Sequence, residues 1–292
     1  MTLIAPTAAV SPVQDTETVA SALASVRRLL NEIDSRALLR HVTGCDEAGL
    51  IAHRDRCLTL VERKKFAHLA GRRAAGEPLA YLIGEREFFG RAFKTAPAVL
   101  IPRPETELLV EFMLEHAPIE RSSRVLDLGT GSGCVAVSIA CERPLARVAA
   151  TDVSAAALEI AHANADAHGC ANIDFICADW LAPLGGERFD IIVSNPPYVA
   201  AADPHLKQLH FEPALALAAG ADGLDAIRVI VAAAPRCLVH GGWLAFEHGF
   251  DQAERCRALL RDAGLENVFS RRDLAGIERI SGGCLRAGAI TP

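Results

Sequence analysis

"VLDLGTGSGCVAVSIA", Val125 to Ala140, joins a short apolar strand pattern to a helical pattern through a turn that contains Gly129, Gly131 and Gly133. Without side chains at these positions, backbone amides and the N-terminus of the following helix can approach a ligand closely. Taken alone, such a turn also fits glycines that serve only a tight bend. The stretch predicts a strand, a turn and a helix, with a candidate ligand site at the turn.

An acidic residue at the expected spacing supports a ligand at this turn. Asp152 lies 19 residues after Gly133, at the end of the next predicted strand. A carboxylate there can accept both hydroxyls of a ribose, which favours a nucleoside-bearing cofactor. The turn begins with Asp127, whose carboxylate would repel a pyrophosphate and attract the ammonium group of a methionine moiety. We therefore expect S-adenosylmethionine rather than NAD.

A second pair of candidate residues follows the next predicted strand. "CADWL" places Asp179 and Trp180 at the carboxyl edge, where open α/β sheets bind their ligands. Asp179 could bond an adenine amine while Trp180 packs beside it. Equally, Asp179 could cap a turn and Trp180 could belong to the core. The predicted cofactor-binding residues are Asp127, Gly129, Thr130, Gly131, Gly133, Asp152, Asp179, Trp180 and Asn195.

The chain divides by its hydrophobic periodicity into a helical part and an α/β part. Apolar residues recur at helical spacing from about Thr16 to Ala75, and "GEP" at Gly76 to Pro78 ends this pattern. Aromatic and β-branched residues split by two glycines then predict a hairpin-like connector. From Arg124 onward strand and helix patterns alternate, which predicts a mostly parallel sheet with helices on both faces. We expect a helical domain at 1–85, a hairpin linker at 86–103 and a catalytic domain at 104–292.

Another predicted strand runs directly into two prolines, in "FDIIVSNPPYVA", Phe189 to Ala200. Pro196 and Pro197 stiffen the chain where it leaves the sheet, on the same edge as the glycine turn. An amide or aryl NH₂ is a poor nucleophile because its lone pair is delocalised. The side-chain oxygen of Asn195 and the backbone carbonyl of Pro196 could each accept one N–H and direct that lone pair at a methyl donor, and Tyr198 offers a ring for stacking. A rigid turn without chemistry is the alternative.

Composition and charge limit the function classes. No apolar run approaches the roughly 18 uncharged residues of a membrane-spanning helix. The first 26 residues contain no Lys or Arg, so we expect neither a signal nor a transit peptide and a soluble, cytoplasmic protein. The formal net charge of −6 argues against binding nucleic acid through phosphate contacts. Neither the nine cysteines nor the ten histidines have metal-ligand spacing, so we expect no metal.

Several longer stretches resemble one family of methyltransferases. "GTGSG" with "NPPY" is typical of amino-methyltransferases as a class. Four longer stretches narrow this class of methyltransferases: "GEPLAYLIGEREFFGRAFKTAPAVLIPRPETELLVE" from Gly76, "HFEPALALAAGADGLDAIRVI" from His210, "FEHGFDQ" from Phe246 and "RRDLAGIER" from Arg271. Together they resemble the HemK/PrmC-type protein-glutamine methyltransferases over nearly the whole chain, and "IPRPETE" is the most specific element.

This resemblance implies a Rossmann-like domain with a seven-stranded sheet, S-adenosylmethionine as methyl donor, and a helical substrate-recognition domain before a hairpin linker. It implies that the acceptor is the glutamine amide in the Gly-Gly-Gln loop of class-1 peptide chain release factors, with no membrane or direct nucleic-acid partner. Asn195, Pro196, Pro197 and Tyr198 match the positions that hold this glutamine. The extension before about Thr16 matches nothing in the family, and we expect it to be disordered.

The element "IPRPETELLVEFM", Ile101 to Met113, reads from its residues alone as the start of a helix. Pro104 fits the first helical position, and the buried stripe is predicted to be Leu108, Leu109, Phe112 and Met113. This reading does not explain Arg103. By resemblance, Arg103 and Glu212 border the active site, and we count both as candidate substrate-binding residues. For Glu212 the alternative is a loop held by its own packing.

Two rival functions remain open. An amino-methyltransferase that acts on adenine or guanine of nucleic acid would use the same turn on a flipped base. A cofactor-binding adaptor would keep the glycine turn without catalysis, and the intact Asn-Pro-Pro-Tyr turn argues against it.

Overall fold

The computed structural model describes residues 17–182, 184 and 186–286. These residues form two compact units, divided between Ile83 and Gly84. The sequence predicted domain boundaries at residues 85 and 103, which stay predictions. The expected disorder before Thr16 concerns residues outside the described part of the chain. No helix in the described part is long and apolar enough to cross a membrane.

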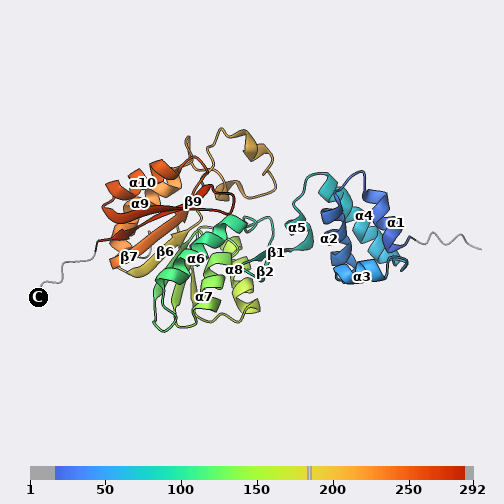
Figure 1. Ribbon diagram of the computed structural model, residues 1–292, viewed down its shortest axis with the longest axis horizontal. Helices are drawn as coiled ribbons and strands as arrows, with labels where there is room; N and C mark the ends of the chain where they lie inside the picture. The colour runs from blue at the N-terminus through green and yellow to red at the C-terminus, as the bar shows by residue number, and fades with distance from the viewer. Residues whose placement is uncertain (1–16, 183, 185, 287–292) are drawn as a thin grey trace, which may run out of the picture. The chain divides into compact units, whose positions relative to one another are not determined.

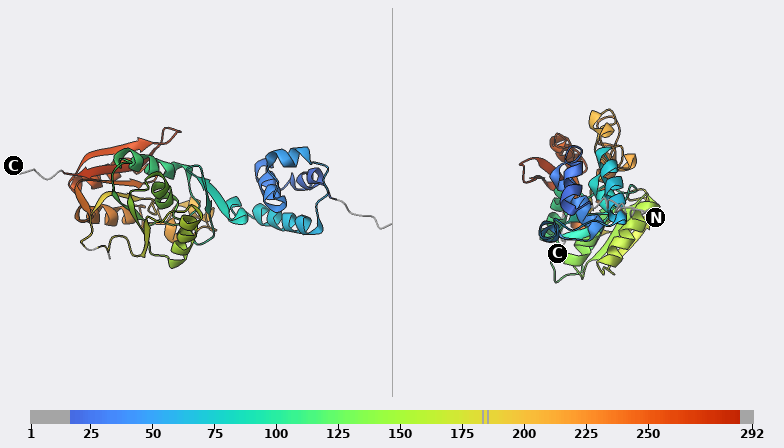
Figure 2. Two further views of the ribbon diagram at one scale, coloured as in Figure 1. Left: turned by 90° about the horizontal axis from the view of Figure 1, so that it is seen from below. Right: turned by 90° about the vertical axis from the view of Figure 1, so that its right-hand side faces the viewer.

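The described residues of the first unit form helices and their connections, as predicted. It contains α1 (Val19–Val26), α2 (Glu32–Thr43), α3 (Glu47–Ala52), α4 (Leu60–Ala74) and α5 (Leu79–Ile83). The first four helices each begin after a side chain that accepts a backbone N–H of the first turn, and this cap explains where each helix begins. The capping residues are Thr18, Asn31, Asp46 and Thr59. α2 packs against α1 and α4 (Figures 1 and 2). One core, with Leu38 and Phe66 at its centre, holds the helices together.

The second unit begins with a hairpin and continues as an α/β domain. β1 (Glu85–Phe88) pairs antiparallel with β2 (Arg91–Lys94). The elements that follow are η1 (Pro104–Thr106), α6 (Glu107–His116), β3 (Arg124–Leu128), α7 (Cys134–Glu142), β4 (Arg147–Asp152), α8 (Ala155–Ala167), β5 (Ile173–Cys177), β6 (Phe189–Ser194), η2 (Pro204–Lys207), η3 (Ala214–Ala216), α9 (Asp225–Cys237), β7 (Leu238–Glu247), α10 (Ala253–Asp262), β8 (Leu265–Arg272) and β9 (Glu278–Leu285).

The central sheet has seven strands in the order β5, β4, β3, β6, β7, β9, β8. The first five of these pair in parallel, and β9 pairs antiparallel with both β7 and β8. Helices α6, α7 and α8 share a hydrophobic core on one face, and α9 and α10 share another on the opposite face (Figure 1). The predicted α/β fold with a seven-stranded sheet is therefore confirmed.

The strand order reverses between β3 and β6, and this places the two sequence motifs side by side. The chain runs from β3 outward to β5 and then returns to the other side of β3. β3 and β6 pair in parallel with Leu128 opposite Ser194, so the glycine turn and Asn195 leave the sheet next to each other. Open α/β sheets bind their ligands outside the carboxyl ends of the strands at such a reversal.

The start of the predicted helix at Pro104 differs in detail. Pro104–Thr106 form a short 3₁₀ turn, and the α-helix begins only at Glu107. Leu108 is half-buried, whereas Val110 is fully buried, so the predicted stripe was wrong at one position. The reason is that α6 packs against α7 as well as β6 and β7, which buries a wider face than one stripe.

Candidate active site

A cavity of about 640 Å³ lies at the carboxyl ends of β3, β4 and β6, within the second unit. Ligand pockets typically occupy roughly 300–1,000 Å³, so this one can hold a nucleoside-sized molecule. Of the predicted site residues, its wall contains Arg103, Gly129, Thr130, Gly131, Asp152, Asp179, Trp180, Asn195 and Pro197. Five other predicted site residues are not part of the wall: Asp127, Gly133, Pro196, Tyr198 and Glu212.

The glycine turn is held by the predicted ribose-binding acid. Asp152 accepts the backbone N–H of Gly131 through Oδ2 and that of Ser154 through Oδ1, both at 2.9 Å. The carboxylate thus fixes the turn after β3 against the turn after β4. Each oxygen keeps a further lone pair, so Asp152 can still accept a ligand hydroxyl. It therefore has a structural role that the sequence did not predict.

Gly133 contacts a helix rather than the cavity. Its backbone is left-handed, with φ +78°, and a Cβ there would lie 3.0 Å from Cβ and 3.2 Å from Cα of Ala161 on α8. Gly131 is also left-handed, with φ +57°, but a Cβ there would meet no protein atom within 4 Å. The two glycines therefore differ in role: Gly133 permits close packing of α7 on α8, and Gly131 leaves space beside the cavity.

Asp127 is buried beneath the turn. Its Oδ2 accepts the hydroxyl of Thr130 at 2.6 Å, and Thr130 lines the cavity. Burial raises the pKa of Asp127 to about 6, against the lowering effect of the hydrogen bonds from Thr130 and the backbone of Ala136. When ionised, Asp127 can therefore attract a cationic ligand group through its electric field, but its side chain does not contact a ligand in the cavity.

Asp179 and Trp180 lie together on the cavity wall. Asp179 is exposed, and Trp180 is partly buried against the core that α9 and α10 share. Trp180 has a left-handed backbone, with φ +49°, which is rare for a bulky residue. Its ring comes within 3.5 Å of the point where Gly129 would carry a Cβ. The strained backbone thus places the indole over the glycine turn.

Asn195 belongs to a hydrogen-bonded chain that also contains Thr106 and Glu247. Asn195 donates from Nδ2 to Thr106 Oγ1 at 3.0 Å, and Thr106 donates from Oγ1 to Glu247 Oε2 at 2.6 Å. Tyr198 donates its hydroxyl to Glu247 Oε1 at 3.0 Å. Asn195 Oδ1 is buried, and no residue in the described part of the chain donates a hydrogen bond to it. A buried acceptor without a donor costs about 1–3 kcal/mol, so this oxygen is suited to receive a ligand N–H.

Glu247 and Thr106 were missed as site residues by the sequence analysis. Glu247 is the last residue of β7 and is 1% exposed, and Thr106 is 2% exposed. Burial raises the pKa of Glu247 to about 7, although the hydrogen bonds from Thr106 and Tyr198 lower it. Burial and the charge of Glu247 also raise the pKa of the Tyr198 hydroxyl. Glu247 could have been found by the reasoning that found Asp152, because each is an acid at the carboxyl end of a strand in the central sheet.

Arg103 and Glu212 form an ion pair with each other. Arg103 donates from Nη2 to Glu212 Oε1, and the backbone N–H of Ile101 donates to Glu212 Oε2 at 3.1 Å. The pair ties the segment at 98–103 to the segment at 213–220, and both segments line the cavity. Arg103 therefore faces the cavity with its charge already balanced, and Glu212 lies behind it.

The backbone of the Asn-Pro-Pro-Tyr turn is fixed from two sides. Val199 exchanges backbone hydrogen bonds of 2.9 Å with Leu217 and Ala219. Gln252 donates from Nε2 to the Tyr198 carbonyl at 3.0 Å. In the described part of the chain, no three His, Cys, Asp or Glu side chains gather as a metal ion would require.

Comparison with known proteins gives matches over both units. The family model described as "Methyltransferase small domain" matches residues 104–211, and "PrmC N-terminal domain" matches residues 17–84. A protein of Xylella fastidiosa (strain 9a5c) named "Release factor glutamine methyltransferase" is 49% identical over 263 residues, covering 89% of this chain and 96% of its own. A protein of the same name from Bordetella pertussis is 52% identical over 259 residues, covering 88% and 96%.

A solved structure supports the fold. A T. thermophilus 16S rRNA methyltransferase, in complex with AdoMet and guanosine, has a TM-score of 0.53 and 22% identity. The match covers 69% of this chain and 50% of that one.

Proposed function

This chain belongs to the release factor glutamine methyltransferase family, and we propose that it transfers a methyl group from S-adenosylmethionine to the glutamine amide in the Gly-Gly-Gln loop of class-1 peptide chain release factors. Methylation of release factors follows from the family, whereas the donor, the loop and the class of release factor belong to the proposal. The relatives do not favour the alternative of a methyltransferase acting on adenine or guanine.

The residues around the cavity fit the proposed donor. Gly131 leaves open space beside the turn, Asp152 has lone pairs for ribose hydroxyls, and Trp180 offers an apolar ring beside the exposed Asp179. The buried charge of Asp127 behind Thr130 favours a cationic group nearby. When bound, S-adenosylmethionine supplies an electrophilic methyl group on a positively charged sulfur.

The observation that carries the proposal is the buried, unpaired Oδ1 of Asn195 beside the glycine turn. A primary amide has two N–H donors. Asn195 Oδ1 would accept one of them, and the backbone carbonyl of Pro196, which lies between the two wall residues Asn195 and Pro197, would accept the other. Holding both N–H groups fixes the plane of the amide and directs the nitrogen lone pair into the cavity. With S-adenosylmethionine bound, the amide nitrogen would take the methyl group, S-adenosylhomocysteine would be the leaving group, and the proton that the nitrogen then loses would pass to water. No general base is required before that point.

We also propose that the helical unit recognises the protein substrate. All the described residues that line the cavity belong to the second unit, which leaves the helical unit free for another task. Mass spectrometry of a tryptic release-factor peptide, after incubation with enzyme and S-adenosylmethionine, tests the proposed function. We expect a mass gain of one CH₂ on the loop glutamine, and its absence would contradict the proposal.

A further inference from the structure

Glu247 lies at one end of a hydrogen-bonded chain whose other end is the unpaired oxygen of Asn195. The chain runs from Glu247 to Thr106 and then to Asn195, over distances of 2.6 and 3.0 Å. Thr106 and Asn195 line the cavity, whereas Glu247 does not. Glu247 therefore cannot act on a ligand in the cavity directly, but it can act through Thr106.

The number of protons on each group sets the direction of this chain. A carboxylate only accepts hydrogen bonds, and a hydroxyl has one proton to donate. Because Thr106 gives its proton to Glu247, it can only accept from Asn195. Asn195 must then turn its NH₂ toward Thr106, which leaves its oxygen for another donor. The ionised carboxylate thus decides which end of the Asn195 amide is free.

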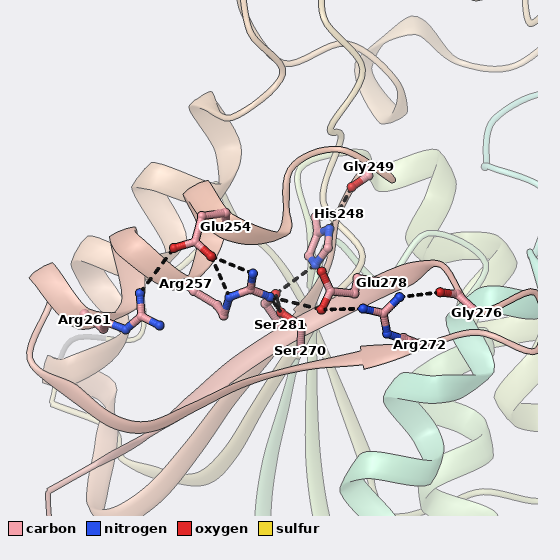
Figure 3. Close-up of polar contacts among 10 residues, drawn as sticks. All are labelled: His248, Gly249, Glu254, Arg257, Arg261, Ser270, Arg272, Gly276, Glu278 and Ser281. Atoms are coloured by element: carbon pink, nitrogen blue, oxygen red, sulfur yellow. Dashed lines mark hydrogen bonds and ion pairs between the residues drawn. The ribbon is translucent and has the colours of Figure 1, made fainter.

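A second network of polar contacts involves His248, the residue after Glu247 in the chain (Figure 3). His248 is fully buried, and its Nδ1 contacts the Gly249 carbonyl at 2.8 Å while its Nε2 contacts Ser281 Oγ at 2.8 Å. Ser281 contacts Ser270 at 2.7 Å, and Arg257 donates to Ser270 at 2.7 Å. A carbonyl only accepts, so Nδ1 carries the proton, and burial lowers the pKa of His248. The neutral ring then accepts from Ser281, which leaves Ser281 Oγ to accept from Ser270.

Burial is the largest influence on Glu247 and raises its pKa to about 7, and nearby charges have smaller effects. Glu105 raises its pKa and Arg279 lowers it, while the hydrogen bonds from Thr106 and Tyr198 favour the ionised form. Arg279 is itself paired with Asp273. Burial also raises the pKa of the thiol of Cys134, the first residue of α7, so this thiol stays neutral.

We propose that Glu247 is a positioning residue for methyl transfer, because through Thr106 it fixes the Asn195 amide with its oxygen toward the substrate. The same carboxylate holds the Tyr198 hydroxyl, so one buried acid orients two side chains of the Asn-Pro-Pro-Tyr turn. This inference rests on the proposed function, since it assigns Asn195 Oδ1 to a substrate N–H.

Glu247→Gln and Thr106→Val test the proposal. Glutamine keeps the volume but has one acceptor oxygen where Glu247 has two, so it cannot accept from both Thr106 and Tyr198, and at least one of these two side chains loses its partner. Valine keeps the shape of threonine without the hydroxyl. We expect each variant to lower single-turnover methyl transfer to a whole release factor about 10²-fold, while the dissociation constant of S-adenosylmethionine changes less than about twofold.

Two controls separate positioning from structure. Thr106→Ser restores the hydroxyl, and we expect it to recover most of the rate lost in Thr106→Val. Glu105→Gln removes a neighbouring negative charge from a side chain outside the cavity wall, and we expect a rate close to wild type at a pH well above 7, where Glu247 is ionised in both proteins. The double variant Thr106→Val/Glu247→Gln should be no slower than the slower single variant, because both changes interrupt one chain.

The pH profile provides a readout that a purely structural role would not change. The wild-type rate should fall as the pH is lowered through about 7, because Glu247 is then protonated, and Glu247→Gln should lack this decline. Near wild-type transfer by Glu247→Gln or by Thr106→Val, or additive losses in the double variant, would overturn the proposal. A wild-type enzyme that leaves the release factor unmethylated would instead overturn the proposed function on which it rests.

Discussion

Replacing each of two glycines of the turn by alanine should separate packing from ligand binding. Gly131 and Gly133 both have left-handed backbones, and an alanine in that conformation costs about 1–2 kcal/mol. At Gly133 the new Cβ would also lie 3.0 Å and 3.2 Å from Cβ and Cα of Ala161. Relief requires α7 to move away from α8, and overpacking of this kind costs about 1–3 kcal/mol more. We therefore expect a loss in unfolding free energy of about 2–5 kcal/mol for Gly133→Ala and about 1–2 kcal/mol for Gly131→Ala.

Ligand affinity should show the opposite order. The Cβ of Gly131→Ala would occupy space beside the cavity, whereas Gly133 is not part of its wall. We expect S-adenosylmethionine to bind about tenfold more weakly to Gly131→Ala, corresponding to about 1.4 kcal/mol, and to be affected less by Gly133→Ala. Urea unfolding measures the first effect and calorimetric titration the second. Equal losses of stability in the two variants, or unchanged affinity in Gly131→Ala, would refute the assigned roles.

Three further predictions concern the acids and the helical unit. Asp152→Ala should weaken S-adenosylmethionine by about 1.5–3 kcal/mol in calorimetry, and an unchanged dissociation constant would mean that the ribose is held elsewhere. The pKa of Glu247 is raised from 4.5 to about 7, so the wild-type protein loses stability as the pH rises through this window and the buried carboxyl ionises. Glutamine does not ionise, so Glu247→Gln should be more stable than wild type above about pH 7, by up to about 3 kcal/mol. The difference should vanish below about pH 4.5. Thermal unfolding across that window checks the sign, and a variant less stable than wild type throughout would contradict it. Deleting the residues before Gly84 should leave cofactor affinity nearly intact and abolish methylation of the whole release factor, whereas a folded truncation that keeps the full rate would contradict the proposed recognition role.

The position of the site could be predicted from the sequence because it depends on local patterns and on strand direction. The glycine turn follows β3 and Asn195 follows β6, and parallel neighbouring strands end at the same edge of a sheet. The same reasoning placed Asp152 at the end of β4. The sequence could not show whether Gly133 faces the cofactor or a helix, since a glycine has the same letter in either role.

The partners of the site residues could not be predicted, because they come from distant parts of the chain. Thr106 bonds Glu247 across 141 positions and Asn195 across 89. Arg103 and Glu212 were each predicted to border the site, but their pairing across 109 positions emerges only from the packing of two loops. The order of a hydrogen-bonded chain depends on which groups are ionised and which lie within hydrogen-bonding distance, and hydrophobic periodicity contains no information on either.

The role of Asn195 as the acceptor for the glutamine amide is tested most directly by Asn195→Ala, measured by single-turnover methylation of a release factor beside titration of S-adenosylmethionine. Removing the side-chain oxygen leaves one substrate N–H unpaired and lets the amide rotate, so methyl transfer should fall about 10²- to 10³-fold while cofactor affinity changes far less. Asn195→Asp, which keeps an acceptor but adds a charge near the sulfonium, should bind the donor more tightly without faster transfer. A loss of cofactor affinity in proportion to the lost rate of Asn195→Ala would contradict the proposed role of the Asn-Pro-Pro-Tyr turn.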